Sequence, residues 1–357
     1  MSAAATDETA FRELVEPYRR ELHAHCYRML GSVHDADDAI QDAMLRAWRG
    51  LAKFEGRSSL RSWLYRIATN TCLDQIGKRP KLTLPTADRP AIEMEKAFDE
   101  PPVERVWIDP YPDIELAAAE DDDPGPATRY EQHESLELAF VVALQLLPPN
   151  QRAALILREV LGFSAAEVAE ALDTSVPSVN SALQRARRTV EDALPERSQQ
   201  ATLEALGDDG LREVVEGYME AMEGGDVERV LELLADDAAW SMPPLRAWFR
   251  GKDRLEGFLR LGPLSGEWRW RHRTTTVNGQ AAIGSYAWLE SERAYLPFAL
   301  DVLRVDAGGH ISEVVSFINR VGEGHEPAAF ARWPELEQHA ERTAVFGRTG
   351  LPERLPA

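Results

Sequence analysis

Apolar residues recur at helical spacing through residues 11–79, and no proline interrupts the chain between Pro17 and Pro80. Because proline is the strongest helix breaker, this pattern predicts a compact helical domain over residues 11–80. A second helical pattern covers residues 131–193, where the pair Pro148-Pro149 separates a first helix, 131–147, from the rest. Two helical domains are therefore expected in the first half of the chain.

The pattern changes after residue 208, where amphipathic helices give way to alternating strands. Helices are predicted at 211–222, 227–234 and 252–259, and strands at 238–242, 268–277, 281–289, 297–305 and 311–318. Asn278-Gly279 and Gly308-Gly309 are typical of tight turns between strands. We predict an α+β module over 208–320, followed by a tail, 321–357, with one short helix near 328–339.

Residues 81–130 are predicted to be a linker, because the chain from Pro80 to Pro126 holds nine prolines. Between Ile92 and Asp123 there are twelve acidic and two basic residues, a net charge of −10. A solvated spacer would have this composition. Trp107 and Tyr111 are costly in a mere spacer, so we expect them to form a contact that regulates the protein.

Composition limits the remaining possibilities. The 357 residues carry 40 basic and 60 acidic side chains, a net charge of −20, which argues against non-specific binding to nucleic acid or acidic membranes. Two cysteines exclude a disulfide framework and fit a reducing compartment. The first ten residues show no signal sequence and no run of about 18 apolar residues occurs, so a cytoplasmic location is expected. His23 and His25 point to different faces of a helix and predict no metal site.

A helix-turn-helix is predicted near residue 175. Ser164 and Glu167 form a capping box, the chain breaks at Asp173-Thr174, and Ser175 caps a second helix. An ordinary helical hairpin with a basic, solvated face would show the same pattern. For a recognition helix, the exposed residues that would contact DNA are Ser178, Ser181, Gln184, Arg185 and Arg188.

Two further segments carry candidate binding residues. In the acidic helix 35–48, Asp38, Gln41, Asp42 and Leu45 lie off the apolar stripe, and an exposed leucine among acids suggests a partner surface, although such a face is often merely solvated. Residues 53–79 carry a local charge of +4 interleaved with aromatic rings, which suits single-stranded DNA. The alternative for Trp63 is that it packs in the core of the domain. The candidates for binding DNA in this segment are Arg57, Arg61, Trp63, Arg66 and Asn70.

Together these segments resemble the extracytoplasmic-function (ECF) sigma factors of bacterial RNA polymerase, with sigma domain 2 over 11–80 and sigma domain 4 over 131–193. The resemblance implies that the acidic helix binds the clamp helices of the largest polymerase subunit. It also implies that the segment 54–79 melts and reads the minus-10 element, with Asn70 next to a flipped base. The helix 176–188 would read the minus-35 element, and the acidic linker would run through the polymerase cleft as an RNA mimic.

Residues 208–320 resemble a SnoaL-like domain, a cone related to nuclear transport factor two. In SnoaL cyclases a His/Asp pair performs acid-base chemistry, so His272, Asp301 and His310 are candidates. No characteristic spacing marks them, and we expect a regulatory or ligand-sensing cone without enzymatic activity, cofactor or metal. Five tryptophans could line its pocket or fill its core: Trp240, Trp248, Trp268, Trp270 and Trp288.

The expected fold is multidomain: two all-α sigma domains, the second with a helix-turn-helix, followed by an α+β SnoaL-like cone with a curved antiparallel sheet. We expect a promoter-specificity subunit whose partners are core RNA polymerase and promoter DNA, with no membrane contact and with regulation in cis by the cone; a small ligand of the cone is left open. One alternative is a ligand-responsive DNA-binding regulator that never joins polymerase, which leaves residues 35–70 unexplained. Another is an enzyme acting on a small molecule in the cone.

Overall fold

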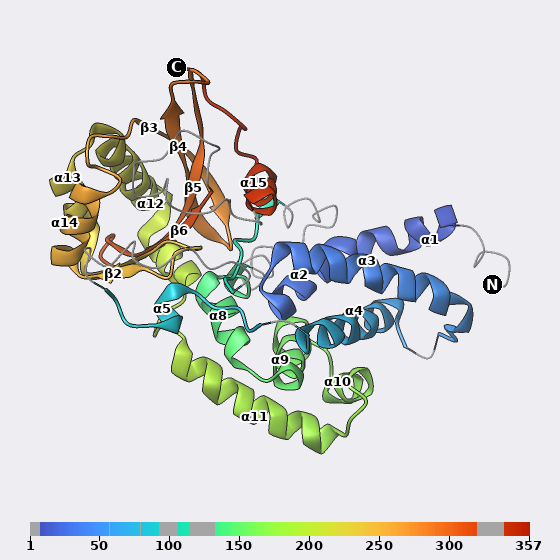
Figure 1. Cartoon of the computed structure of the whole chain (residues 1–357). Helices are drawn as coiled ribbons and strands as arrows, with labels where there is room; N and C mark the ends of the chain where they lie inside the picture. Colours follow the sequence, from blue (N-terminus) through green and yellow to red (C-terminus); the bar gives the residue numbers. More distant parts are fainter. Residues whose placement is uncertain (1–7, 57, 79, 93–105, 115–132, 320–338) are drawn as a thin grey trace. The chain divides into compact units, whose positions relative to one another are not determined.

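The computed structural model describes residues 8–56, 58–78, 80–92, 106–114, 133–319 and 339–357 (Figure 1). The chain forms two compact units, which we call the helical unit and the cone unit. The helical unit comprises Met1–Leu82 and Glu115–Pro195, and the cone unit comprises Thr83–Ile114 and Glu196–Ala357. Both predicted helical domains thus belong to one unit, and the middle of the predicted linker folds with the C-terminal module.

The first part of the helical unit consists of α1 (Glu8–Val15), α2 (Arg19–Leu30), α3 (Val33–Gly50) and α4 (Leu60–Ile76). Serine hydroxyls cap α3 and α4: Ser32 accepts from the amide of Asp35, and Ser59 accepts from that of Ser62. α2 ends at Gly31, whose φ of +76° is a left-handed conformation that favours glycine. These local signals fix the helix boundaries.

The second part of the helical unit consists of α8 (Leu138–Leu146), α9 (Pro149–Leu155), α10 (Ala165–Ala171) and α11 (Val176–Ala193), with one π-helical turn, Ile156–Val160, after α9. The predicted capping box is present: the Ser164 side chain accepts from the Glu167 amide, and the Glu167 carboxylate accepts from the Ser164 amide. Ser175 caps α11. The predicted helix-turn-helix, α10 and α11, is therefore confirmed.

Buried polar contacts join the two helical parts inside this unit. The Arg28 guanidinium on α2 donates to the carbonyl and the hydroxyl of Ser135, at 3.2 and 2.8 Å. Arg152 on α9, which is 4% exposed, donates to the carbonyls of Met29, Gln145 and Leu147. Burial lowers the pKa of Arg152 to about 10. The bonds from Arg28 to Ser135 and from Arg152 to Met29 cross between the two parts and hold them together.

The cone unit is built on a six-stranded sheet with the order β2-β1-β6-β5-β4-β3. Its strands are β1 (Leu234–Ser241), β2 (Trp248–Arg250), β3 (Trp270–Val277), β4 (Gln280–Leu289), β5 (Ala294–Val305) and β6 (Ile311–Ile318). β1 runs parallel to β6 and every other pair is antiparallel, so the expected antiparallel sheet contains one parallel pair. The three-residue strand β2 was not predicted.

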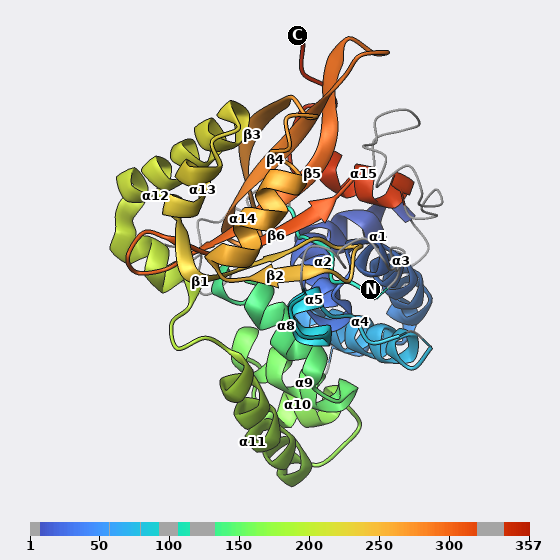
Figure 2. The same cartoon turned by 60° about the vertical axis from the view of Figure 1, so that its left-hand side comes forward.

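The helices α12 (Gln199–Gly224), α13 (Val227–Leu233) and α14 (Lys252–Leu261) pack against one face of this sheet (Figure 2). Tyr218, Trp240, Phe249, Phe258 and Leu303 are among the residues of the resulting core. The predicted hairpin at Asn278-Gly279 is present, with φ values of +55° and +65°. The first helix starts earlier than expected and is interrupted at Gly207, whose φ and ψ are not helical.

The end of the predicted tail belongs to the cone unit. α15 (His339–Arg348) places Phe346 beside Gly284, where an added Cβ would lie only 3.1 Å from that ring, and Leu355 pairs with Tyr295 of β5. The short helix predicted near 328–339 lies, apart from His339, outside the described residues. None of the described helices has the length and apolar composition needed to cross a membrane.

Candidate polymerase and DNA interfaces

The acidic face predicted to bind a partner is formed by α3. Asp38, Gln41, Asp42 and Leu45 are all exposed, and Leu45 exposes 53% of its surface. Ala39, Ile40, Ala43 and Ala47 on the same helix are buried. The first three of the exposed residues line one hollow together with Gln75 and Lys78 at the end of α4. The four predicted residues therefore share one accessible surface.

α4 carries four of the five residues predicted to contact the minus-10 strand, while Arg57 lies outside the described residues. Trp63 is half-buried and its ring lies 4.9 Å from that of Phe54, so it packs within the unit. Asn70 is half-buried. Arg61 pairs with Glu21, whose carboxylate also accepts from the Tyr65 hydroxyl at 3.1 Å. Arg61 also lies over the rings of Tyr65 and Phe163.

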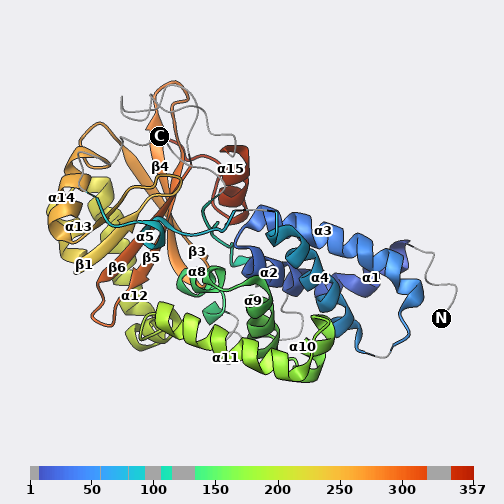
Figure 3. The ribbon, with the colours of Figure 1, turned by 60° about the horizontal axis from the view of Figure 1, so that its bottom comes forward.

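The first helix of the helix-turn-helix, α10, contacts α4 on the side that carries Ser62 and Arg66 (Figure 3). The Ser62 hydroxyl donates to the Glu167 carboxylate of α10 at 3.3 Å, and Arg66 pairs with Glu170 of α10 at 3.5 Å. The hydrogen bonds from Ser164 lower the pKa of Glu167, which favours the charged form. In this arrangement two acidic side chains of α10, Glu167 and Glu170, bind two polar side chains of α4, Ser62 and Arg66.

On α11 the predicted division into two faces is present. Val179, Leu183, Ala186 and Val190 are buried, whereas Val176, the first residue of the helix, is 38% exposed. Arg187 donates from Nε to the Glu159 carboxylate at 2.7 Å. The residues predicted to contact DNA are all exposed on this helix: Ser178, Ser181, Gln184, Arg185 and Arg188.

Residues 106–114 of the predicted linker, which we call the linker segment, dock on the cone. Trp107 is 6% exposed, and its indole Nε1 donates to the carbonyl of Pro244 at 3.2 Å. Tyr111 is 1% exposed, and its backbone exchanges hydrogen bonds with Asn278 at the β3–β4 turn. The buried Asp113 carboxylate accepts from the Gly279 amide at the same turn. Nothing in the local sequence pattern identifies these acceptors.

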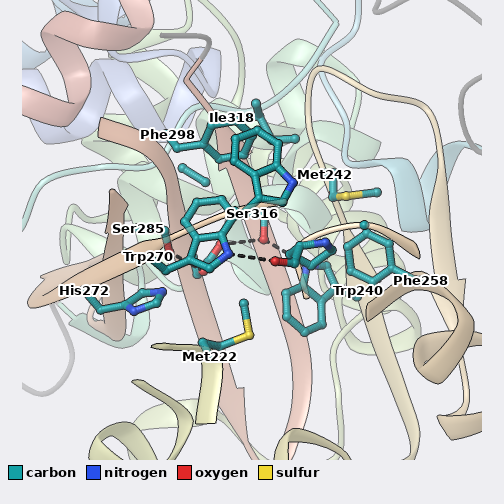
Figure 4. A pocket seen from close by; sticks show the side chains of 15 residues that line it. Met222, Trp240, Met242, Phe258, Trp270, His272, Ser285, Phe298, Ser316 and Ile318 are labelled. Carbon is teal, nitrogen blue, oxygen red and sulfur yellow. Dashed lines mark hydrogen bonds between the residues drawn. The ribbon is translucent and has the colours of Figure 1, made fainter. Parts of the chain in front are cut away.

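A pocket opens in the cone between the sheet and the helices (Figure 4). Aromatic rings form much of its wall, including Trp240, Trp268 and Trp270. Trp248 instead donates from Nε1 to the carbonyl of Arg89, and Trp288 donates to Glu290. The pocket includes two of the three candidate catalytic residues, His272 and Asp301, whereas His310 is half-exposed at a turn beside Asp306 and does not line it.

Three hydroxyl groups surround Asp301 at this pocket. Its carboxylate accepts from Ser316 at 2.5 Å, from Ser285 at 2.8 Å and from Tyr218 at 3.3 Å. Ser316 also accepts from the Trp240 indole at 2.9 Å. Burial raises the pKa of Asp301, because a charge is poorly solvated there. The network fixes the orientation of the carboxylate.

Comparison with known proteins agrees with this division of the chain. Residues 14–81 match the model for sigma-70 region 2, residues 137–190 that for sigma-70 region 4, and residues 215–314 that for a SnoaL-like domain. Two such helical domains, the second with a helix-turn-helix, define a sigma factor, the subunit that directs RNA polymerase to promoters. Core RNA polymerase and promoter DNA are the partners of this class of protein.

The ECF RNA polymerase sigma factor SigG of Mycobacterium tuberculosis is 40% identical over 350 residues, which are 97% of this chain and 85% of SigG. The chain belongs to the ECF sigma factors. SigW of Bacillus subtilis is 29% identical over 53% of this chain and 90% of its own length. The crystal structure of the Mycobacterium tuberculosis sigma factor SigJ shares the fold, with a TM-score of 0.51 at 22% identity, over 90% of this chain and 99% of that one.

Proposed function

We propose that this sigma factor is closed when it is free of polymerase, and that core polymerase must separate its two helical parts before α4 can bind DNA. The observation that carries the proposal is the contact of α10 with α4. Glu170 pairs with Arg66, and Glu167 accepts from Ser62, so side chains of α10 lie on part of the face of α4 assigned to the minus-10 strand. A strand cannot occupy that part of the face at the same time.

The energy that favours the closed form comes from the buried contacts more than from the ion pairs. Arg66 and Glu170 are exposed, and such pairs contribute up to about 1 kcal/mol each. Phe163, 7% exposed, packs edge-on against Tyr65, with ring centroids 5.4 Å apart. Arg152 adds the buried hydrogen bond to Met29. Binding to polymerase must offset these contacts.

Within this proposal each predicted surface has one role. The exposed face of α3 binds core polymerase, and α4 captures the melted minus-10 strand while α11 reads the minus-35 duplex. The core-binding residues are Asp38, Gln41, Asp42 and Leu45. The DNA-binding residues are Arg57, Arg61, Trp63, Arg66 and Asn70 near and on α4, and Ser178, Ser181, Gln184, Arg185 and Arg188 on α11.

The cone regulates in cis through the linker and performs no catalysis. Trp107 and Tyr111 fasten the segment between the two helical parts to the cone, and this supports their role as the regulatory contact. The carboxylate of Asp301 is engaged by three hydroxyl groups, which supports a structural role for it. Truncation at the unit boundary, after Pro195, would leave the linker rings without their partners, so point variants in the full chain are the better test.

The closed form can be tested with Glu170→Arg, which replaces the ion pair with Arg66 by a repulsion. Loss of an exposed ion pair lowers the free-energy difference that favours the closed form over the open form by about 1 kcal/mol. Core polymerase should therefore bind the variant about fivefold more tightly. Binding is measured by fluorescence anisotropy of sigma factor labelled at its N-terminus. Asp192→Arg on α11 is the matched charge reversal and should leave the affinity unchanged. Leu45→Arg should abolish binding, so the anisotropy change that this variant lacks is the part of the signal that comes from specific binding. Unchanged affinity of the Glu170 variant would refute the closed form.

A further inference from the structure

One polar group in the cone pocket lacks a partner. His272 on β3 is fully buried, and within the described part of the chain neither of its ring nitrogens has a hydrogen-bond partner. Its backbone amide donates to the Glu223 carboxylate at 2.7 Å, and its Nδ1 lies 3.4 Å from the same oxygen. Figure 4 shows the imidazole beside Trp270 and Met222 at the edge of the pocket. Buried polar atoms are normally satisfied, so Nε2 indicates a missing partner.

The surroundings of His272 define the chemistry of that partner. The Glu223 carboxylate favours the proton on Nδ1, which leaves Nε2 as a hydrogen-bond acceptor. The partner must therefore present a donor. Among the described residues that line the pocket there is no lysine or arginine, and the buried Asp301 carboxylate disfavours an anion. Because Asp301 already accepts from three hydroxyl groups, it offers little to a cation.

The shape of the pocket selects the rest of the ligand. Trp268 and Trp270 are stacked with centroids 5.1 Å apart, and Phe298 meets both rings edge-on. Rigid aromatic walls of this kind bind flat apolar groups, and a few placed polar atoms orient them. The pocket therefore selects for a ring that fits between these walls.

We propose that the cone pocket binds an uncharged, ring-bearing small molecule whose hydroxyl group donates a hydrogen bond to Nε2 of His272. This inference goes beyond the closed form of the sigma factor and does not depend on it, because it is tested by binding alone. It assigns to the cone the recognition of a phenol-like or alcohol-bearing ring compound. His272 is the residue that distinguishes such a compound from a plain hydrocarbon.

The test uses the full-length protein and two probes of nearly equal size, 2-naphthol and naphthalene, in equilibrium dialysis. 2-Naphthol should bind about tenfold more tightly, because only its hydroxyl satisfies Nε2. In His272→Phe the affinity for 2-naphthol should fall to that for naphthalene, and retained naphthalene binding shows that the pocket is intact. His310→Phe, on the exposed turn, should change neither affinity.

Each of three outcomes would overturn the inference. Equal affinities for the two probes would remove the role of Nε2, and binding of neither probe would remove the ligand class. Undiminished 2-naphthol binding in His272→Phe would place the hydroxyl elsewhere. Failure of the closed form in the polymerase experiment would leave all three of these results unaffected, so the two proposals fail independently.

Discussion

Replacement of Trp107 by alanine should release the linker segment from the cone. The indole is 6% exposed and donates to the Pro244 carbonyl, and truncation of a buried tryptophan costs about 3–5 kcal/mol. The freed backbone regains conformational entropy, so we take the lower end of this range. A cost of about 3 kcal/mol corresponds to an increase of roughly 150-fold in the population of the undocked segment.

Hydrogen exchange of backbone amides measures this opening directly. The amide of Thr83 donates to the Val106 carbonyl at 2.9 Å, and that of Ile108 donates to the Thr83 carbonyl at 3.0 Å. Both amides should exchange about 100-fold faster in Trp107→Ala. Trp107→Phe keeps a ring but loses the indole donor, so it should cause about a fivefold effect. Trp288→Ala, a half-buried tryptophan on β4, is the control. Unchanged exchange at Thr83 and Ile108 in Trp107→Ala would refute the docking argument.

Two further predictions concern the helical unit. Arg185→Ala should weaken binding to minus-35 duplex, whereas Asn70→Ala should spare duplex binding and impair strand opening, and a permanganate footprint that is unchanged in the Asn70 variant would contradict its role. Burial lowers the pKa of His25 to about 3, so below pH 6.5 the unfolded chain takes up a proton that the folded unit does not. Stability should therefore fall by about 1.4 kcal/mol per pH unit as the pH decreases from 6.5, and urea unfolding of His25→Gln should lack this slope.

The elements that the sequence predicted well are those determined by neighbouring residues. Ser164 and Glu167 start a helix because their side chains bond amides within the same turn. Asn278 and Gly279 form a hairpin because both adopt positive φ. β6 has the predicted bounds, because a run rich in β-branched residues and phenylalanine follows the turn at Gly308-Gly309. In each case the signal and the structure that it specifies lie within a few residues of each other.

The remaining features depend on pairings between distant segments, which a local pattern does not encode. Trp107 and Pro244 are 137 positions apart, and Arg66 and Glu170 are 104 apart. The parallel pairing of β1 with β6 joins strands separated by most of the module. The three residues of β2 are too few to show alternation. For the candidate site, the sequence predicted which faces are exposed but not that α10 contacts α4.

The pocket and the linker share one loop of the cone, and this loop is a physical route for the regulation in cis that we propose. Met242 lines the pocket, and the Pro243 carbonyl accepts from the amide of Ile318, which lines it as well. The next carbonyl, that of Pro244, accepts from Trp107. Protein interiors are close-packed, so an occupant that displaces Met242 acts on the acceptor of the linker two residues away. Coupling of this kind is reciprocal: release of the linker must change the affinity of the pocket by the same factor by which a ligand changes linker docking.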